Sequence, residues 1–169
     1  RRDPAYIDDP EITEYVRKVG QRLAAATSET AGIDFEFFVV RDPQINAFAL
    51  PGGYIGVHSG LITAAMTESE LASVLSHEIA HVTQRHIARQ LQNQSQIGAL
   101  SMVGLVLAML AAKSNPQVAQ AAAMAGSAAP VAAFLNYSRE FEREADRVGY
   151  QILRAAGYDV QAMPAFFER

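Results

Sequence analysis

Apolar residues in the first third of the chain follow first a helical and then a strand spacing. After Asp9 and Pro10, apolar residues recur every three or four positions over residues 12–23, which predicts an amphipathic helix capped by the aspartate. Residues 33–40 alternate between polar and apolar and then become wholly apolar, as in a strand that becomes buried on both faces. Two short apolar runs within residues 46–57 flank a Pro-Gly-Gly turn and predict a β-hairpin.

Two further helices are expected after the hairpin. Thr67 and Glu70 have the spacing of a capping box, and apolar residues then recur at helical spacing to about Leu91. Another helical pattern covers residues 139–155 and ends at Gly157. Because the strands precede these helices rather than alternate with them, the order of elements favours an α+β fold over a doubly wound sheet.

The stretch between these two helices, residues 90–136, differs in composition from the rest of the chain. It is almost wholly apolar over residues 97–112, and Lys113 is its only formal charge. Connections this long are uncommon between packed helices, so we expect a helical insertion that is a lid, an interfacial helix or a buried helix. Its 16 apolar residues would form a helix of about 24 Å, which is short for a hydrocarbon core of about 30 Å.

Length and composition indicate a single globular domain over residues 1–169. A chain of this length that is 50% hydrophobic can bury a core without disulfides or a structural metal. Its 14 basic and 18 acidic side chains leave no excess of positive charge, so we expect no nucleic-acid partner. The absence of cysteine excludes thiol catalysis and cysteine metal sites. The chain has neither an initiator Met nor an apolar signal segment, and we therefore expect it to be a piece of a longer protein.

The pattern His-Glu-x-x-His occurs once, within the helix that begins at Thr67. His77 and His81 are about 40° apart on one helix face, so both imidazoles can reach one zinc ion. Glu78 lies about 60° from His81, where its carboxylate can accept a proton from the attacking water without being a ligand. The alternative is two unrelated surface histidines, which would not require the capped helix that surrounds them.

A catalytic zinc ion needs a third protein ligand. His86 lies about 140° from His81 and 180° from His77 on a continuous helix, so we expect a packing or surface histidine there. His58, on the second hairpin strand, is a weaker candidate, and a plain strand residue is expected. The remaining candidates are the four carboxylates within residues 140–146.

The spacing of these carboxylates leaves two faces of the last helix open. Glu142 and Asp146 flank its apolar stripe on one side, and Glu140 and Glu144 flank it on the other. Gly149 continues the Glu142 side and would let a second helix approach closely. A solvated charged face paired with nearby arginines is the alternative interpretation.

The combination of His-Glu-x-x-His with a later Glu-x-x-Ala-Asp, residues 142–146, resembles the HtpX-like and CAAX-prenyl-protease-like zinc metallopeptidases of the gluzincin type. The resemblance implies a zincin-like domain in which a small sheet with an antiparallel edge packs on helices and the zinc helix is central. It implies one zinc ion, Glu142 as the third ligand, and Asp146 as the acceptor that orients a ligating histidine. The segment that begins with Asn46, Ala47 and Phe48 resembles the one these enzymes place before the zinc helix, and we expect it to bind substrate as an added strand.

Pro51-Gly52-Gly53 and residues 82–86 look most like the periplasmic beta-barrel assembly-enhancing protease group. This resemblance implies a zinc metalloendopeptidase that hydrolyses unfolded or misassembled polypeptides, in the periplasm or on the periplasmic side of a membrane. It also implies contact with a membrane surface or with outer-membrane assembly machinery, and a downstream repeat region that this chain lacks. A non-proteolytic zinc-containing chaperone is the alternative function.

Overall fold

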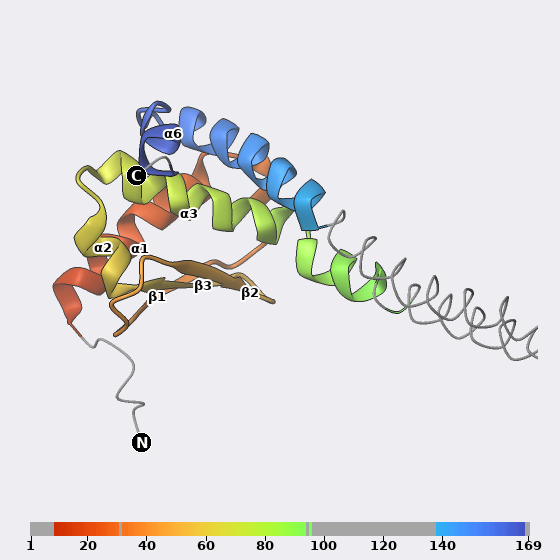
Figure 1. The fold of residues 1–169 in the computed structure, drawn as a ribbon, viewed down its shortest axis with the longest axis horizontal. Coiled ribbons are helices and arrows are strands. Elements are labelled where there is room, and N and C mark those ends of the chain that lie inside the picture. The colour runs from red at the N-terminus through yellow and green to blue at the C-terminus, as the bar shows by residue number, and fades with distance from the viewer. Residues whose placement is uncertain (1–8, 31, 94, 96–137, 168–169) are drawn as a thin grey trace, which may run out of the picture. The chain divides into compact units, whose positions relative to one another are not determined.

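The computed structural model describes residues 9–30, 32–93, 95 and 138–167 (Figure 1). The chain forms two compact units, one made of Arg1–Arg85 with Arg143–Arg169 and the other of His86–Glu142. The first unit holds a small sheet and the helices packed on it. The predicted α+β class is confirmed.

A three-stranded mixed sheet is the base of the first unit. Its strands are β1 (Glu36–Val40), β2 (Ala47–Leu50) and β3 (Tyr54–His58), in the order β1-β3-β2. β3 pairs in parallel with β1 and antiparallel with β2, which confirms the predicted hairpin. Because β3 lies between the other two strands, β2 is an antiparallel edge strand. β1 begins at Glu36, later than the predicted range 33–40.

Helices α1 (Pro10–Ala25) and α3 (Glu68–Thr83) lie on the same face of this sheet (Figure 1). α1 contacts β1, and α3 contacts β2. The strand residues that alternate towards the helices are fully buried, which accounts for the period-two pattern in the sequence. The members of the shared core from these strands are Phe37, Val39, Ala47, Ile55 and Val57.

Both predicted helix caps are present. The Asp9 carboxylate accepts a hydrogen bond from the backbone N–H of Glu11 at 2.9 Å. The Thr67 hydroxyl accepts one from the backbone N–H of Glu70 at 3.2 Å, and the Glu70 carboxylate accepts one from the backbone N–H of Met66 at 2.7 Å. These bonds satisfy backbone donors that the first turn of a helix leaves free, and so fix where α1 and α3 begin.

The prediction that the zinc helix continues to about Leu91 is wrong, because α3 ends at Thr83. Arg85 has φ 54°, a left-handed conformation that a helix cannot contain. The backbone N–H of Gln84 still donates to the carbonyl of Ala80 at 2.9 Å, whereas the N–H of Arg85 donates to the carbonyl of Val82 at 3.0 Å, a tighter bond that closes the last turn. A separate helix follows over residues 86–93.

Three short elements were not predicted from the sequence. They are the six-residue helices α2 (Ser59–Ala64) and α6 (Ala162–Phe167) and the single 3₁₀ turn η1 (Ser28–Thr30). Each is too short to show a helical period in its apolar residues.

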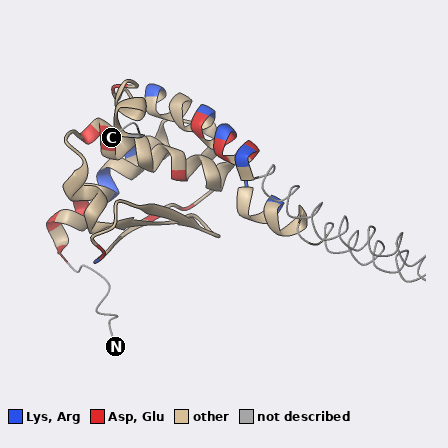
Figure 2. Cartoon of the chain, viewed as in Figure 1, with Lys and Arg blue, Asp and Glu red and all other residues tan. Residues whose placement is uncertain are grey.

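A helix over residues 138–155 matches the predicted range 139–155. From residue 143 onward it belongs to the first unit, where it lies against α3 (Figure 1). Basic and acidic side chains alternate along it (Figure 2). It ends as predicted at Gly157, which has φ 75° and is followed by a hydrogen bond from the Tyr158 N–H to the Leu153 carbonyl at 3.2 Å. Its residues in the shared core are Ala145, Val148, Ile152 and Leu153.

Within the second unit, His86 packs against the first turn of the helix over residues 138–155. Its side chain is 2% exposed, and its ring stacks on that of Phe141 with centroids 4.6 Å apart. The Arg89 guanidinium lies 4.7 Å from the same ring centroid. His86 is therefore a packing residue, as expected. The prediction used the angles between His86 and the two other histidines on a continuous helix, whereas α3 in fact ends at Thr83.

Most of the predicted insertion over residues 90–136, including its apolar run, lies outside the described residues. Among the helices that the structure does describe, none is long and apolar enough to cross a membrane.

Candidate metal centre

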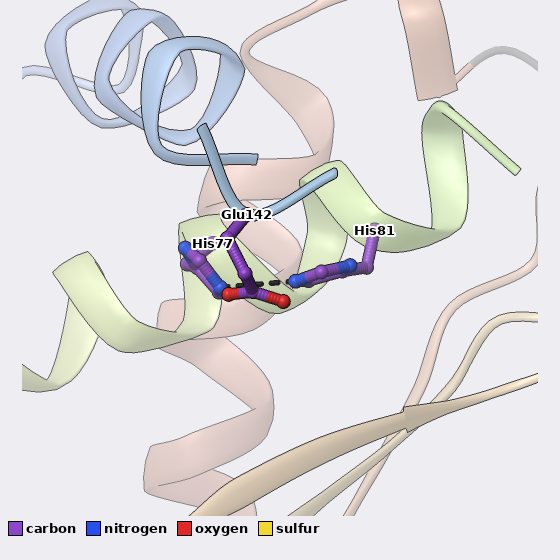
Figure 3. A group of neighbouring side chains, drawn as sticks. All are labelled: His77, His81 and Glu142. Carbon is purple, nitrogen blue, oxygen red and sulfur yellow. Dashed lines mark hydrogen bonds between the residues drawn. The ribbon is translucent and has the colours of Figure 1, made fainter. Parts of the chain in front are cut away.

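His77 and His81 lie one turn apart on α3 and project from the same side of it (Figure 3). Their Nε2 atoms are 3.0 Å apart, and their ring centroids are 4.7 Å apart. His77 is buried and His81 is half-buried. The two nitrogens thus converge on one point beside the helix.

The carboxylate of Glu142 completes the group. One ligand atom from each of His77, His81 and Glu142 lies within 4.8 Å of the other two. Figure 3 shows the carboxylate directed towards both rings. Among the described residues, this is the one group of three or more metal-ligating side chains. Glu142 is exposed, so the group lies at the surface of the protein.

Asp146 contacts the other nitrogen of His77. Its Oδ1 lies 3.0 Å from His77 Nδ1, with the aspartate side chain 59% exposed and the histidine side chain 11% exposed. A carboxylate at this position favours the tautomer with the proton on Nδ1, which leaves Nε2 free to bind a metal. The Asp146 carboxylate therefore lies within ion-pair distance of the nitrogen of His77 that faces away from His81.

Glu78 directly follows the first histidine on α3 and is half-buried. Glu78 is about 60° from His81 around the helix and is not a member of the metal-ligating group. This position suits a proton acceptor that is not a metal ligand.

The donor set fits zinc. Two imidazole nitrogens and one carboxylate oxygen are the protein ligands of one common class of catalytic zinc site, in which a fourth position stays open. Tetrahedral ligands about 2.0–2.1 Å from zinc lie about 3.3 Å from one another. The observed 3.0 Å between the histidine nitrogens is close to that spacing, and the ligand oxygen of Glu142 lies within 4.8 Å of both nitrogens.

The expected substrate-binding residues Asn46, Ala47 and Phe48 lie at the start of β2. Ala47 is buried towards the helices, whereas the Phe48 ring lies on the opposite face of the sheet, against Gly56. The Asn46 carbonyl accepts a hydrogen bond from the N–H of His58 at 3.0 Å. Their backbone therefore runs along the edge of the sheet beside α3.

His58 does not join the metal group in the described part of the chain. Its Nδ1 lies 3.7 Å from Oδ1 of Asp42, and its ring packs edge-on against Phe48. The expectation of a plain strand residue agrees with this packing.

One feature of the site could not be derived from residue spacing alone. Helical angles left Glu142 with Asp146, and Glu140 with Glu144, as equal candidates. The structure brings the first pair to His77, on the side of the helix where Gly149 had been expected to let a second helix approach closely.

Residues 10–167 match the sequence profile described as Peptidase family M48. The chain belongs to peptidase family M48. The resemblance inferred from the His-Glu-x-x-His and Glu-x-x-Ala-Asp motifs is thereby confirmed. In this M48 domain, His77, His81 and Glu142 are the residues that could hold a metal ion.

Named relatives of this M48 domain come from bacteria and from mitochondria. A Vibrio cholerae protein that carries the name of a beta-barrel assembly-enhancing protease is 44% identical over 169 residues, which cover 100% of this chain and 35% of the relative. The beta-barrel assembly-enhancing protease of Escherichia coli is 40% identical over 96% of this chain and 33% of its own length. The mitochondrial metalloendopeptidase OMA1 of Arabidopsis thaliana is 32% identical over 95% of this chain and 31% of its own length. The chain thus spans about a third of the length of these relatives.

Proposed function

We propose that this domain is a zinc-dependent endopeptidase that hydrolyses peptide bonds in unfolded or misassembled proteins of the bacterial cell envelope. The observation that carries the proposal is the grouping of His77, His81 and Glu142 next to Glu78 in a metallopeptidase domain. Two nitrogens, one oxygen and an adjacent proton acceptor are the parts that zinc-dependent peptide hydrolysis requires.

His77, His81 and Glu142 would hold the ion, and Asp146 would keep the His77 ring in the orientation that presents Nε2. Zinc bound there supplies Lewis-acid chemistry, which polarises the scissile carbonyl and makes water a nucleophile at neutral pH. The carboxylate of Glu78 takes a proton from the attacking water and later gives it to the leaving amine. Because Glu78 does not bind the ion, replacing it should separate hydrolysis from metal binding.

The substrate would lie along β2. This edge strand pairs with β3 on one side only, so its outer backbone groups can hydrogen-bond to an extended polypeptide. Asn46, Ala47 and Phe48 supply the backbone of this edge. Recognition through main-chain bonds tolerates many sequences, which suits an enzyme that acts on unfolded proteins.

The proposed location is the periplasm or the periplasmic side of a membrane. It rests on the relatives from Vibrio cholerae and Escherichia coli, whose names refer to β-barrel assembly. Contact with outer-membrane assembly machinery or a membrane surface is proposed on the same ground. We further propose a single M48 domain over residues 1–169 in which residues 90–136 are an insertion.

The test is a Glu78→Gln variant, because the amide keeps the shape of the carboxylate but cannot accept the proton. We expect one zinc per chain as in wild type, and at least a 100-fold loss of hydrolysis of an unfolded outer-membrane protein. Glu11→Gln on α1, an exposed glutamate outside the metal group, is the matched control and should leave hydrolysis unchanged.

Two results would contradict the proposal. Near-normal hydrolysis by Glu78→Gln would show that another group accepts the proton. A wild-type protein that binds zinc and unfolded clients but hydrolyses none would favour the zinc-containing chaperone instead.

A further inference from the structure

The backbones of α3 and of the helix over residues 138–155 approach each other most closely at Gly149. A Cβ atom placed on Gly149 would lie 3.0 Å from both Cα and N of His77, and 3.2 Å from the carbonyl carbon of Ser76. These are backbone atoms in the middle of a helix, so no side-chain rotation can relieve the contact. Any side chain at position 149 therefore requires the two helices to separate by a few tenths of an ångström.

The residue that Gly149 touches is itself one of the metal-ligating histidines. Asp146 precedes Gly149 by three positions, and Glu142 precedes it by seven, so all three share the side of the helix that faces α3. The distance between the two helices at Gly149 thus sets how far these carboxylates stand from the histidine. The observed result is a separation of 3.0 Å between His77 Nδ1 and Asp146 Oδ1.

We propose that Gly149 is a positioning residue that sets the zinc affinity of the site by fixing the spacing of the two helices that supply the ligands. The inference rests on the proposed zinc site. Metal–ligand distances are held to within about 0.2 Å, so a shift of a few tenths of an ångström between ligand-bearing helices exceeds what the site tolerates. A glycine needed only for general packing would instead affect stability and leave the affinity for zinc unchanged.

Gly20 provides the control for general packing. It lies in α1, and a Cβ there would come within 2.3 Å of the Phe37 ring, away from the metal group. Gly20→Ala and Gly149→Ala are thus the same chemical change at two close contacts in helices. Alanine also has a higher helix propensity than glycine, which offsets part of the strain in both variants.

The experiment measures zinc affinity by chelator competition in the 169-residue chain, with circular dichroism and thermal unfolding of the metal-free proteins. We expect Gly149→Ala to fold and to bind zinc about 10-fold or more weakly, the scale seen when residues that support metal ligands are removed. We expect Gly20→Ala to unfold at a lower temperature yet to keep wild-type zinc affinity. Cobalt bound in place of zinc should show an altered visible absorption spectrum in Gly149→Ala only.

The outcomes separate this inference from the function on which it rests. Wild-type chain that binds no stoichiometric zinc would refute the proposed function. If wild type binds zinc, the role of Gly149 is overturned by unchanged affinity in Gly149→Ala, by an equal loss in Gly20→Ala, or by a Gly149→Ala protein that no longer folds.

Discussion

The contact between Asp146 and His77 joins a half-exposed carboxylate to a buried imidazole. Because the aspartate side chain is 59% exposed, solvent screens the pair, and such pairs add only about 0–1 kcal/mol to folding stability. The contact is better suited to holding the imidazole in one tautomer and one plane than to stabilising the fold.

Replacing this aspartate by alanine should therefore affect the metal more than the fold. We expect Asp146→Ala to weaken zinc binding about 10–100-fold, since the loss of a partner that orients a ligand has this effect in metal sites. The midpoint of thermal unfolding of the metal-free protein should stay close to wild type. Chelator competition and thermal unfolding measure the two quantities, and a structure in which Asp146 binds the metal while Glu142 points to solvent would contradict the assignment.

Residue spacing predicted that His77 and His81 would be metal ligands and that Glu78 would be a proton acceptor. It did not predict which carboxylate would be the third ligand of the metal site. The motif is local, so the geometry of one helix was sufficient for His77 and His81. Glu142 lies on a different helix, and which side of that helix meets α3 depends on tertiary packing at Gly149 and Leu153. The family resemblance supplied the choice that spacing left open.

Three elements of the first unit meet at Tyr158, just after the end of the helix over residues 138–155. Its hydroxyl donates to Oε1 of Glu68 at 3.1 Å, at the start of α3. The Arg22 guanidinium of α1 lies 4.3 Å from the tyrosine ring centroid and donates through Nε to the carbonyl of Ala156 at 3.0 Å. These contacts hold the far end of the Glu142 helix in place, so they belong to the support of the site.

Burial, followed by the hydrogen bond and the negative charge of Glu68, raises the pKa of Tyr158 to about 12. An unfolded tyrosine has a pKa near 10, so between about pH 10 and 12 the folded protein binds more protons than the unfolded one. The stabilisation from this phenol is therefore fully present below about pH 10 and is lost as the pH rises towards 12.

A Tyr158→Phe variant tests this link between elements. It should be less stable than wild type below pH 10, and the difference should shrink as the pH approaches 12. Thermal unfolding across this range measures the difference, and absorbance titration should show one fewer high-pKa tyrosine in the variant. A difference in stability that is constant with pH would show that the phenol does not titrate in this way.

The starts of α1 and α3 were predicted, whereas the end of α3 was not. Asp9 and Thr67 carry side chains that make recognisable cap bonds, so α1 and α3 begin where the sequence indicated. The end of α3 has no glycine or proline signal, and its break depends on the left-handed conformation of Arg85. The apolar spacing continues across this break to Leu91, which is exposed in the structure, so the spacing alone could not reveal where α3 ends.

The whole chain combines a local motif with a ligand that is distant in sequence. His77, Glu78, His81 and Asp146 belong to the first unit, and Glu142, the last residue of the second, lies one turn before Asp146 on the same helix. Composition and charge excluded thiol chemistry and argued against nucleic-acid binding, but they could not indicate a substrate. The chain spans about a third of the length of its named relatives and carries the residues that the proposed hydrolysis requires.

The central claim is that His77, His81 and Glu142 together hold one zinc ion. The most direct test measures the zinc content and zinc affinity of two variants of the protein, each with one glutamate of the same helix replaced. Glu142→Gln removes the proposed third ligand, and Glu140→Gln makes the same change at an exposed glutamate outside the metal group. We predict that Glu140→Gln binds one zinc per chain with wild-type affinity. Loss of a residue that only supports a ligand weakens zinc binding about 10–100-fold, and we predict that Glu142→Gln weakens it by more than this. Wild-type zinc affinity in Glu142→Gln, or an equal loss in Glu140→Gln, would contradict the account.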